Sequence, residues 1–169
     1  MSRRPRLLLA AYACQPERGS ESLVGWNRAV EATRFADVEA LVHAYDEDAA
    51  AIERAVAREG LSELLRFHYL PHTPVERALQ RLPGGFYASY WLWHRRAFRL
   101  ATDLHDRRPF DLAHLATING FREPGQLWRL GVPYVWGPLG GTQNTPDAFV
   151  GLSGPVSYTH LTLPTKRIV

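Results

Sequence analysis

Near its start the chain reads Arg6-Leu7-Leu8-Leu9-Ala10-Ala11-Tyr12-Ala13, and this stretch decides the fold. An apolar run of this length, followed by a polar turn at residues 15–20, is typical of a strand buried on both faces. The later sequence predicts strands at residues 38–44, 65–70, 111–115 and 133–136, and helices at 20–33, 46–58, 86–106 and 126–130. This alternation predicts an α/β fold, a Rossmann-like parallel sheet with helices on both faces.

The composition of the chain limits the classes of protein and partner that need to be considered. The chain has 169 residues, 46% hydrophobic and 22% charged, which suits one domain with its own core. Its net charge of +3 falls to +1 without residues 156–169, which hold Lys166, Arg167 and no acid. Charge therefore does not favour a nucleic-acid partner. A single cysteine, Cys14, and no run of ~20 apolar residues predict a cytoplasmic protein, in which contact with the inner face of the membrane stays open.

The end of the chain differs from the rest. Residues 157–165 read SYTHLTLPT, a sequence similar to translated sequencing-adapter read-through. We therefore expect residues 1–154 to form the native domain, incomplete at its C-terminal end, and residues 155–169 to be a non-native tail. A native extended tail is the alternative.

Candidate site residues follow the predicted strands, because ligands of open parallel sheets bind beyond the carboxyl ends of the strands. Gly19, Ser20 and Glu21 precede the first helix, where free backbone amides favour a phosphate, and Ser20 is the expected N-cap. An ordinary turn and cap is the alternative. His114 closes the fourth strand and Asn119 lies in the loop after it. A histidine there can orient a hydroxyl or take its proton, or can be purely structural.

The third loop is rich in residues that allow close approach of the backbone to a ligand: Gly137, Pro138, Gly140 and Gly141. Its alternative is a plain connection between strand and helix.

Other chemistries lack their motifs. His68 and His72 are only four residues apart, but no Cys-x-x-Cys accompanies them, and no metal is expected. The Gly-x-Gly-x-x-Gly fingerprint is missing, which disfavours an NAD-dependent oxidoreductase. The aromatic stretch at residues 86–98, with Arg95, Arg96 and Arg99 near its end, fits a core helix with a solvated arginine face. An interfacial helix on anionic lipid, and with it peripheral membrane contact, is the alternative.

Three segments resemble bacterial family 4 glycosyltransferases in order and spacing, over residues 6 to about 150. They read AYACQPERGSE (11–21) continuing to VGWN (24–27), RPFDLAH (108–114) and LWRLGVPYVWGPLGG (127–141). The third segment is the most specific. The resemblance implies the GT-B architecture of two Rossmann-like domains, of which this chain holds the N-terminal, acceptor-side domain. In that family most of the donor is held by the C-terminal domain, so we expect the fragment to be inactive alone.

The resemblance also implies the reaction. It is transfer of a sugar, with retention, from a nucleotide-sugar donor to a glycan or lipid-linked acceptor of the cell envelope, without cofactor or metal. Gly19, Ser20 and Glu21 match the family's glycine-rich loop near the donor diphosphate, although Ser20 replaces a second glycine. His114 matches the histidine that closes the Asp-Leu-x-His strand, while many relatives carry their acceptor-side histidine where this chain has Ala116. A non-catalytic Rossmann-like binding module remains the rival hypothesis.

Overall fold

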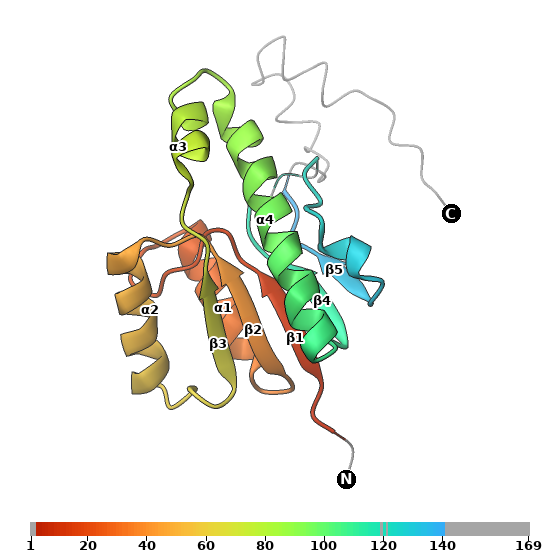
Figure 1. Ribbon diagram of the computed structural model, residues 1–169. Coiled ribbons are helices and arrows are strands. Elements are labelled where there is room, and N and C mark those ends of the chain that lie inside the picture. Colours follow the sequence, from red (N-terminus) through yellow and green to blue (C-terminus); the bar gives the residue numbers. More distant parts are fainter. Residues whose placement is uncertain (1–2, 119, 121, 141–169) are drawn as a thin grey trace, which may run out of the picture.

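A five-stranded parallel sheet forms the centre of the protein. The computed structural model describes residues 3–118, 120 and 122–140. The sheet has the order β3-β2-β1-β4-β5, with every neighbouring pair parallel (Figure 1). The predicted Rossmann-like α/β fold is therefore confirmed. The bounds of its strands are β1 (Arg6–Ala10), β2 (Asp37–Val42), β3 (Leu65–Tyr69), β4 (Leu112–Leu115) and β5 (Tyr134–Trp136).

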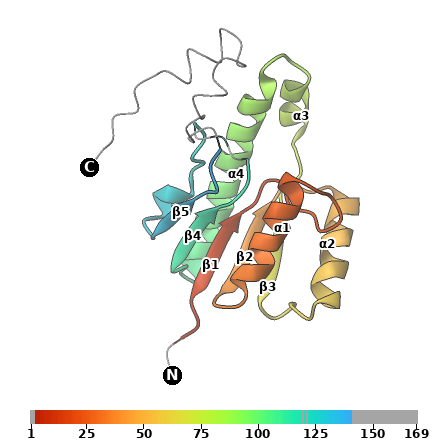
Figure 2. The ribbon, with the colours of Figure 1, turned by 180° about the vertical axis from the view of Figure 1, so that it is seen from behind.

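Helices cover both faces of the sheet. The helices are α1 (Glu21–Ala32), α2 (Asp46–Arg58), α3 (Pro74–Gln80) and α4 (Gly85–Arg107), with a 3₁₀ turn, η1 (Leu127–Leu130). Figure 1 shows α4 in front of the sheet, and Figure 2, from behind, shows α1 in front of it. Leu7 and Leu9 of β1 pack with α1 and α2, whereas Leu8 and Ala10 pack with α4. Because successive side chains of a strand alternate in direction, a strand covered on both faces must be apolar throughout.

Local signals explain most helix ends. Helix α2 begins with three acids, at residues 46–48, which suit the positive end of the helix dipole, and Gly60 follows its end with a φ of +69°. Ser20 does precede α1, but its side chain makes no capping hydrogen bond, contrary to expectation. Its backbone instead adopts a φ of 59°, a region that favours glycine.

The sequence prediction missed helix α3. Its first turn is a capping box, in which Thr73 accepts a hydrogen bond from the Glu76 amide and Glu76 accepts one from the Thr73 amide. Helix α4 starts close behind it, because a Cβ at Gly85 would lie 1.8 Å from the Leu79 carbonyl oxygen. Helix α3 and the first part of α4 extend beyond the carboxyl ends of the strands, whereas the rest of α4 lies across the sheet (Figures 1 and 2). We call residues 71–102, which hold α3 and most of α4, the α3–α4 hairpin.

A buried arginine ties the opposite edge of the sheet together. Arg6 pairs with Glu39 of β2 and donates to the carbonyl of Arg108, while Glu39 also lies 2.8 Å from His68 Nε2 of β3. The hydrogen bond from His68 and the pairing with Arg6 outweigh burial and lower the pKa of Glu39. Three strands are thereby joined, from Arg6 at the start of β1, through Glu39 of β2, to His68 near the end of β3.

Candidate functional site at the carboxyl edge of the sheet

The loop after β1 approaches helix α1 very closely. A Cβ on Gly25 would lie 2.1 Å from the Ala13 carbonyl oxygen and 3.1 Å from Thr117 Cγ2, so only glycine allows this contact. Gly19 and Ser20 are exposed just before the first turn of α1. The amino-terminal end of the helix is thus presented at the carboxyl edge of β1, as the sequence predicted.

Two loops far apart in sequence meet at the point where the strand order reverses. The Ile118 amide donates to the Glu21 carboxylate at 2.6 Å, and the Ala13 amide donates to Thr117 Oγ1 at 3.2 Å. These bonds join the loop after β1 to the loop after β4. In open α/β sheets, ligands bind in the crevice at this reversal of order.

Ile118 itself is strained. Its φ of 64° is a genuine outlier for a β-branched residue, and Ser20 on the facing loop also has a positive φ. Backbone outliers of this kind persist where the surroundings over-determine them, and they cluster at ligand sites. Asn119, which was expected in this site, lies outside the described residues.

His114 joins β4 to the third candidate loop. It faces the α1 side of the sheet, because its neighbours Ala113 and Leu115 are in the α4 layer. Its Nε2 lies 2.9 Å from the Gly137 carbonyl oxygen, to which a neutral imidazole donates. Burial lowers the pKa of His114, and the bond to Gly137 offsets this only in part. The imidazole is therefore uncharged at neutral pH and fixes Gly137, while its catalytic role stays a prediction.

The glycine-rich loop continues the pairing of β4 with β5. Gly140 bridges Gly120 in parallel, and Gly137 has a φ of 148°, a conformation that requires glycine. Pro138 is exposed beside them. The structure thus brings Gly137 and Gly140 next to the loop after β4, whereas Gly141 lies outside the described residues.

An aromatic cavity that the sequence analysis missed lies between α4 and the segment after β4. It has a volume of about 620 Å³, and its lining is mostly apolar. Tyr90 lines the cavity and its hydroxyl donates to the Thr117 carbonyl at 3.4 Å, which connects the cavity wall to the crevice. A second hollow, of about 340 Å³, continues from it toward Gly120. The aromatic and histidine lining residues are Tyr87, Tyr90, Trp91, His94 and Trp128, and the charged ones are Arg122, Glu123 and Arg129.

His94 forms a neutral wall of this cavity. The ring is 2% exposed and packs edge-on against Tyr90, with centroids 4.4 Å apart. Burial lowers its pKa to about 4, so it carries no charge at neutral pH. Its Nε2 has no hydrogen-bond partner within the part of the chain that the structure describes. The only sequence signal for this wall was the helical spacing of residues 90 and 94, and the same spacing is expected of residues in a hydrophobic core.

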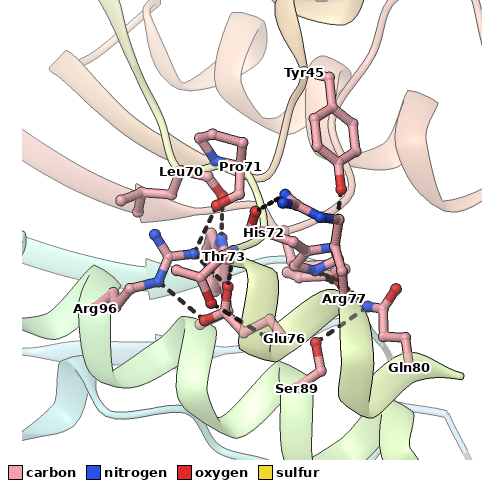
Figure 3. Close-up of polar contacts among 12 residues, drawn as sticks. Tyr45, Leu70, Pro71, His72, Thr73, Glu76, Arg77, Gln80, Ser89 and Arg96 are labelled. Atoms are coloured by element: carbon pink, nitrogen blue, oxygen red, sulfur yellow. Dashed lines mark hydrogen bonds and ion pairs between the residues drawn. The ribbon is translucent and has the colours of Figure 1, made fainter. Parts of the chain in front are cut away.

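A polar cluster anchors the α3–α4 hairpin beside the carboxyl edge of the sheet. Tyr12 OH lies 2.7 Å from His72 Nε2, and the rings of His72 and His43 are 3.8 Å apart. Burial lowers the pKa of His43 to about 4, helped by the neighbouring His72. Figure 3 shows His72 with Gln80 reaching toward Ser89, and Arg96 reaching across to Glu76. Both histidines are thus neutral parts of a structural network.

Two further kinds of site were sought among the described residues: a metal-ion cluster and a helix that spans a membrane. Within residues 3–118, 120 and 122–140, no three side chains of histidine, cysteine, aspartate or glutamate gather in a way that could hold a metal ion. None of the helices in these ranges is both long and apolar enough to cross a bilayer.

Comparisons with known proteins extend only to the fold. No protein-family model and no curated protein matches the chain. A solved structure of the GT-B glycosyltransferase UGT73P12 from Glycyrrhiza uralensis, complexed with glycyrrhetinic acid 3-O-monoglucuronide, is 14% identical with a TM-score of 0.50. The match covers 78% of this chain and 27% of the plant protein. The C-terminal domain of a hydrogenase from Pyrococcus furiosus is 16% identical with a TM-score of 0.48, over 80% of this chain and 92% of that domain. The chain therefore has a Rossmann-like α/β fold that is also found in a GT-B glycosyltransferase.

Proposed function

We propose that this chain is the acceptor-side domain of a nucleotide-sugar-dependent glycosyltransferase. The observation that carries the proposal is the Glu21 to Ile118 hydrogen bond of 2.6 Å, which closes two loops over the point of strand reversal. A bond between such distant loops orders a crevice at the place where open α/β sheets bind ligands. The shared fold of a GT-B glycosyltransferase and the resemblance of residues 11–27, 108–114 and 127–141 support the same conclusion.

The donor diphosphate lies at the start of α1 in this proposal. Backbone amides there and the positive end of the helix dipole attract an anion. When the bond from the anomeric carbon to the phosphate oxygen breaks, charge grows on the departing diphosphate, and oriented amides stabilise it. Glu21 is a positioning residue, because its carboxylate holds the Ile118 amide and thereby fixes the facing loop. The other contacts to the donor come from a second domain, which the proposal places after residue 154.

The acceptor lies on the aromatic side of the crevice. The cavity next to Tyr90 is large and mostly apolar, and His94 adds no charge to its wall. Its charged lining residues are Arg122, Glu123 and Arg129. A glycan or lipid-linked acceptor offers a hydroxyl oxygen that bonds to the anomeric carbon as the bond to the diphosphate oxygen breaks, and the hydroxyl proton passes to that departing oxygen. We propose transfer with retention of configuration, as in the family that the sequence resembles.

Ligand titration by NMR tests this proposal on residues 1–169. We expect UDP-glucose or GDP-mannose to shift the amide signals of residues 19–22 and 118, whereas NADH leaves them unchanged. Glu21→Ala should weaken this binding about tenfold, since a hydrogen bond to a charged group is lost. Glu31→Ala is the matched control, because Glu31 is an exposed glutamate of the same helix whose carboxylate pairs with Arg34.

Equal shifts with NADH would support the oxidoreductase instead. Binding of a nucleotide sugar without any sugar transfer, by a longer chain that includes the sequence after residue 154, would favour the non-catalytic module. Analysis of the anomeric configuration of the product tests retention.

A further inference from the structure

Exposed apolar side chains gather on the α3–α4 hairpin. Ten large hydrophobic residues are exposed among the described residues, and half of them belong to residues 71–102. Val75, Leu82 and Tyr87 are each about 60% exposed. Isolated exposed apolar residues are ordinary, but a cluster on one projecting element marks an interaction surface. The five are Val75, Leu82, Phe86, Tyr87 and Trp91.

The same hairpin carries the positive charge of the protein. Residues 71–102 contain five arginines and one acid, Glu76, for a net charge of +4, while the whole chain carries +3. The remainder of the chain is therefore net negative by one charge. Glu76 is 1% exposed and pairs with Arg96, so it contributes no negative surface. The last turns of α4, residues 103–107, hold Asp103, Asp106 and Arg107, so the positive charge is concentrated in residues 71–102.

Apolar and basic groups are interleaved on one surface. Tyr87, Trp91 and Arg95 follow each other at four-residue spacing along α4, and the Arg95 guanidinium lies 4.9 Å from the centre of the Trp91 ring. Arg95 and Arg99 also line a groove of about 310 Å³ with Val75 of α3 and Leu92 of α4. Aromatic rings beside arginines, together with aliphatic side chains, match the mixed chemistry of a lipid headgroup region.

The surface is rigid before any partner arrives. The capping box of α3, the Glu76 to Arg96 ion pair and the contact of Gly85 with Leu79 fix the two helices against each other. Gln80 of α3 also donates to Ser89 of α4 at 3.2 Å. A preformed surface loses little conformational freedom on binding, which favours association.

We propose that the α3–α4 hairpin docks on an anionic lipid bilayer, with its apolar tip in the interface and its arginines at the headgroup phosphates. Charge complementarity selects an anionic surface, and the exposed aliphatic residues Val75 and Leu82 select lipid over nucleic acid, whose backbone offers them no apolar contact. This docking stands on the hairpin alone and does not depend on sugar transfer.

Vesicle sedimentation with residues 1–169 tests the docking. The protein binds vesicles of phosphatidylcholine with 30% phosphatidylglycerol at 0.1 M salt, and binds pure phosphatidylcholine far more weakly. Each arginine near an anionic surface adds about fivefold, so the double variant Arg95→Gln with Arg99→Gln binds roughly 25-fold more weakly. Raising the salt to 0.5 M removes most of the difference in binding between this double variant and the native protein, because the charges are screened. Leu82→Ser weakens binding about tenfold at either salt concentration.

The matched control carries the same kinds of change outside the hairpin. Phe35→Ser combined with Arg54→Gln removes an exposed aromatic ring and an exposed arginine from the α1 and α2 side, and binding stays within twofold. Three binding results overturn the proposal: equal binding to neutral and anionic vesicles, an equal loss in the control, or tighter binding to oligouridylate than to anionic vesicles. A change of oligomeric state in Arg95→Gln with Arg99→Gln, seen by analytical ultracentrifugation without loss of vesicle binding, overturns it in favour of a second copy.

Discussion

The ion pair between Glu76 of α3 and Arg96 of α4 makes a sharp prediction about the hairpin. Glu76 accepts from Arg96 Nε at 3.0 Å, from Arg96 Nη2 at 2.8 Å and from the Thr73 amide at 2.7 Å (Figure 3). Arg96 also donates to the Pro71 carbonyl at 2.8 Å. Replacing Arg96 by glutamine leaves a carboxylate that is 1% exposed with only its bonds inside the capping box.

Glu76 and Arg96 differ in burial, so replacing one or the other should destabilise the protein by different amounts. Removing one partner of a buried pair costs ~3–5 kcal/mol, and we expect about 3 kcal/mol for Arg96→Gln, because the Arg96 side chain is 26% exposed. This lowers the melting temperature by about 6–12 °C. Glu76→Gln costs less, about 1.5 kcal/mol, because the remaining guanidinium still reaches water and the Pro71 carbonyl. The double variant is less destabilised than the sum of the two.

The pH dependence identifies the buried carboxylate as the cause. Burial alone would raise the pKa of Glu76, but the bonds from Arg96 and Thr73 outweigh it and lower the pKa below 4.5. In the native protein this stabilisation is present above pH 4.5 and is lost as the pH falls through the lowered pKa. In Arg96→Gln burial prevails and the pKa rises. The variant's deficit is therefore largest at pH 7 and shrinks as its Glu76 becomes protonated.

Urea unfolding at pH 7 and pH 4, followed by tryptophan fluorescence, measures both effects. Arg99→Gln, an exposed arginine on the same helix, is the control and should stay within about 0.5 kcal/mol of the native protein. An Arg96→Gln variant as stable as this control at pH 7, or one with the same deficit at both pH values, would refute the reasoning.

Three further predictions concern the crevice and its walls. Ser20→Gly should stabilise the protein by about 1 kcal/mol in urea unfolding, since a φ of 59° is strained for serine; destabilisation would mean that the hydroxyl is needed. Gly25→Ala should cost at least about 2 kcal/mol, because its Cβ meets the Ala13 carbonyl at 2.1 Å, whereas Gly19→Ala, with nothing within 4 Å, serves as the unchanged comparison. The free energy of unfolding should decrease as the pH is lowered from 6.5 to 4, by up to about 1.4 kcal/mol per pH unit for each neutral buried histidine. The reason is that the imidazole is protonated at a higher pH in the unfolded chain than in the folded protein. His94→Leu should flatten this slope, and an identical slope in the variant would show that the pKa of His94 is not lowered.

Most of the elements could be predicted because their signals are local. Helix α2 begins and ends at the predicted residues 46 and 58, since its acidic first turn, apolar face and terminal glycine lie within one short stretch. Helix α3 was missed, because Pro71, Pro74 and Pro83 suggested an irregular segment. Its stability depends on the Thr73 capping box and on Arg96, twenty residues away. A seven-residue helix needs such contacts, because isolated short helices are marginal in water.

The candidate site also has features that could be predicted from the sequence and features that only the structure shows. The sequence by itself determined that the strands are parallel and that β1 is buried on both faces, because periodicity is written in adjacent residues. It also placed Gly19, Ser20, Glu21 and Gly137 in loops or at a helix start after strands, and His114 near the end of β4, because turn chemistry is local. Only the tertiary structure decided that β1 lies between β2 and β4, that Glu21 binds the Ile118 amide, and that His114 binds Gly137 rather than standing free. It also decided that aromatic residues of α4 enclose a cavity with the segment after β4. These contacts join residues 23 to 97 positions apart, and no local pattern encodes which of many possible partners a strand or side chain meets.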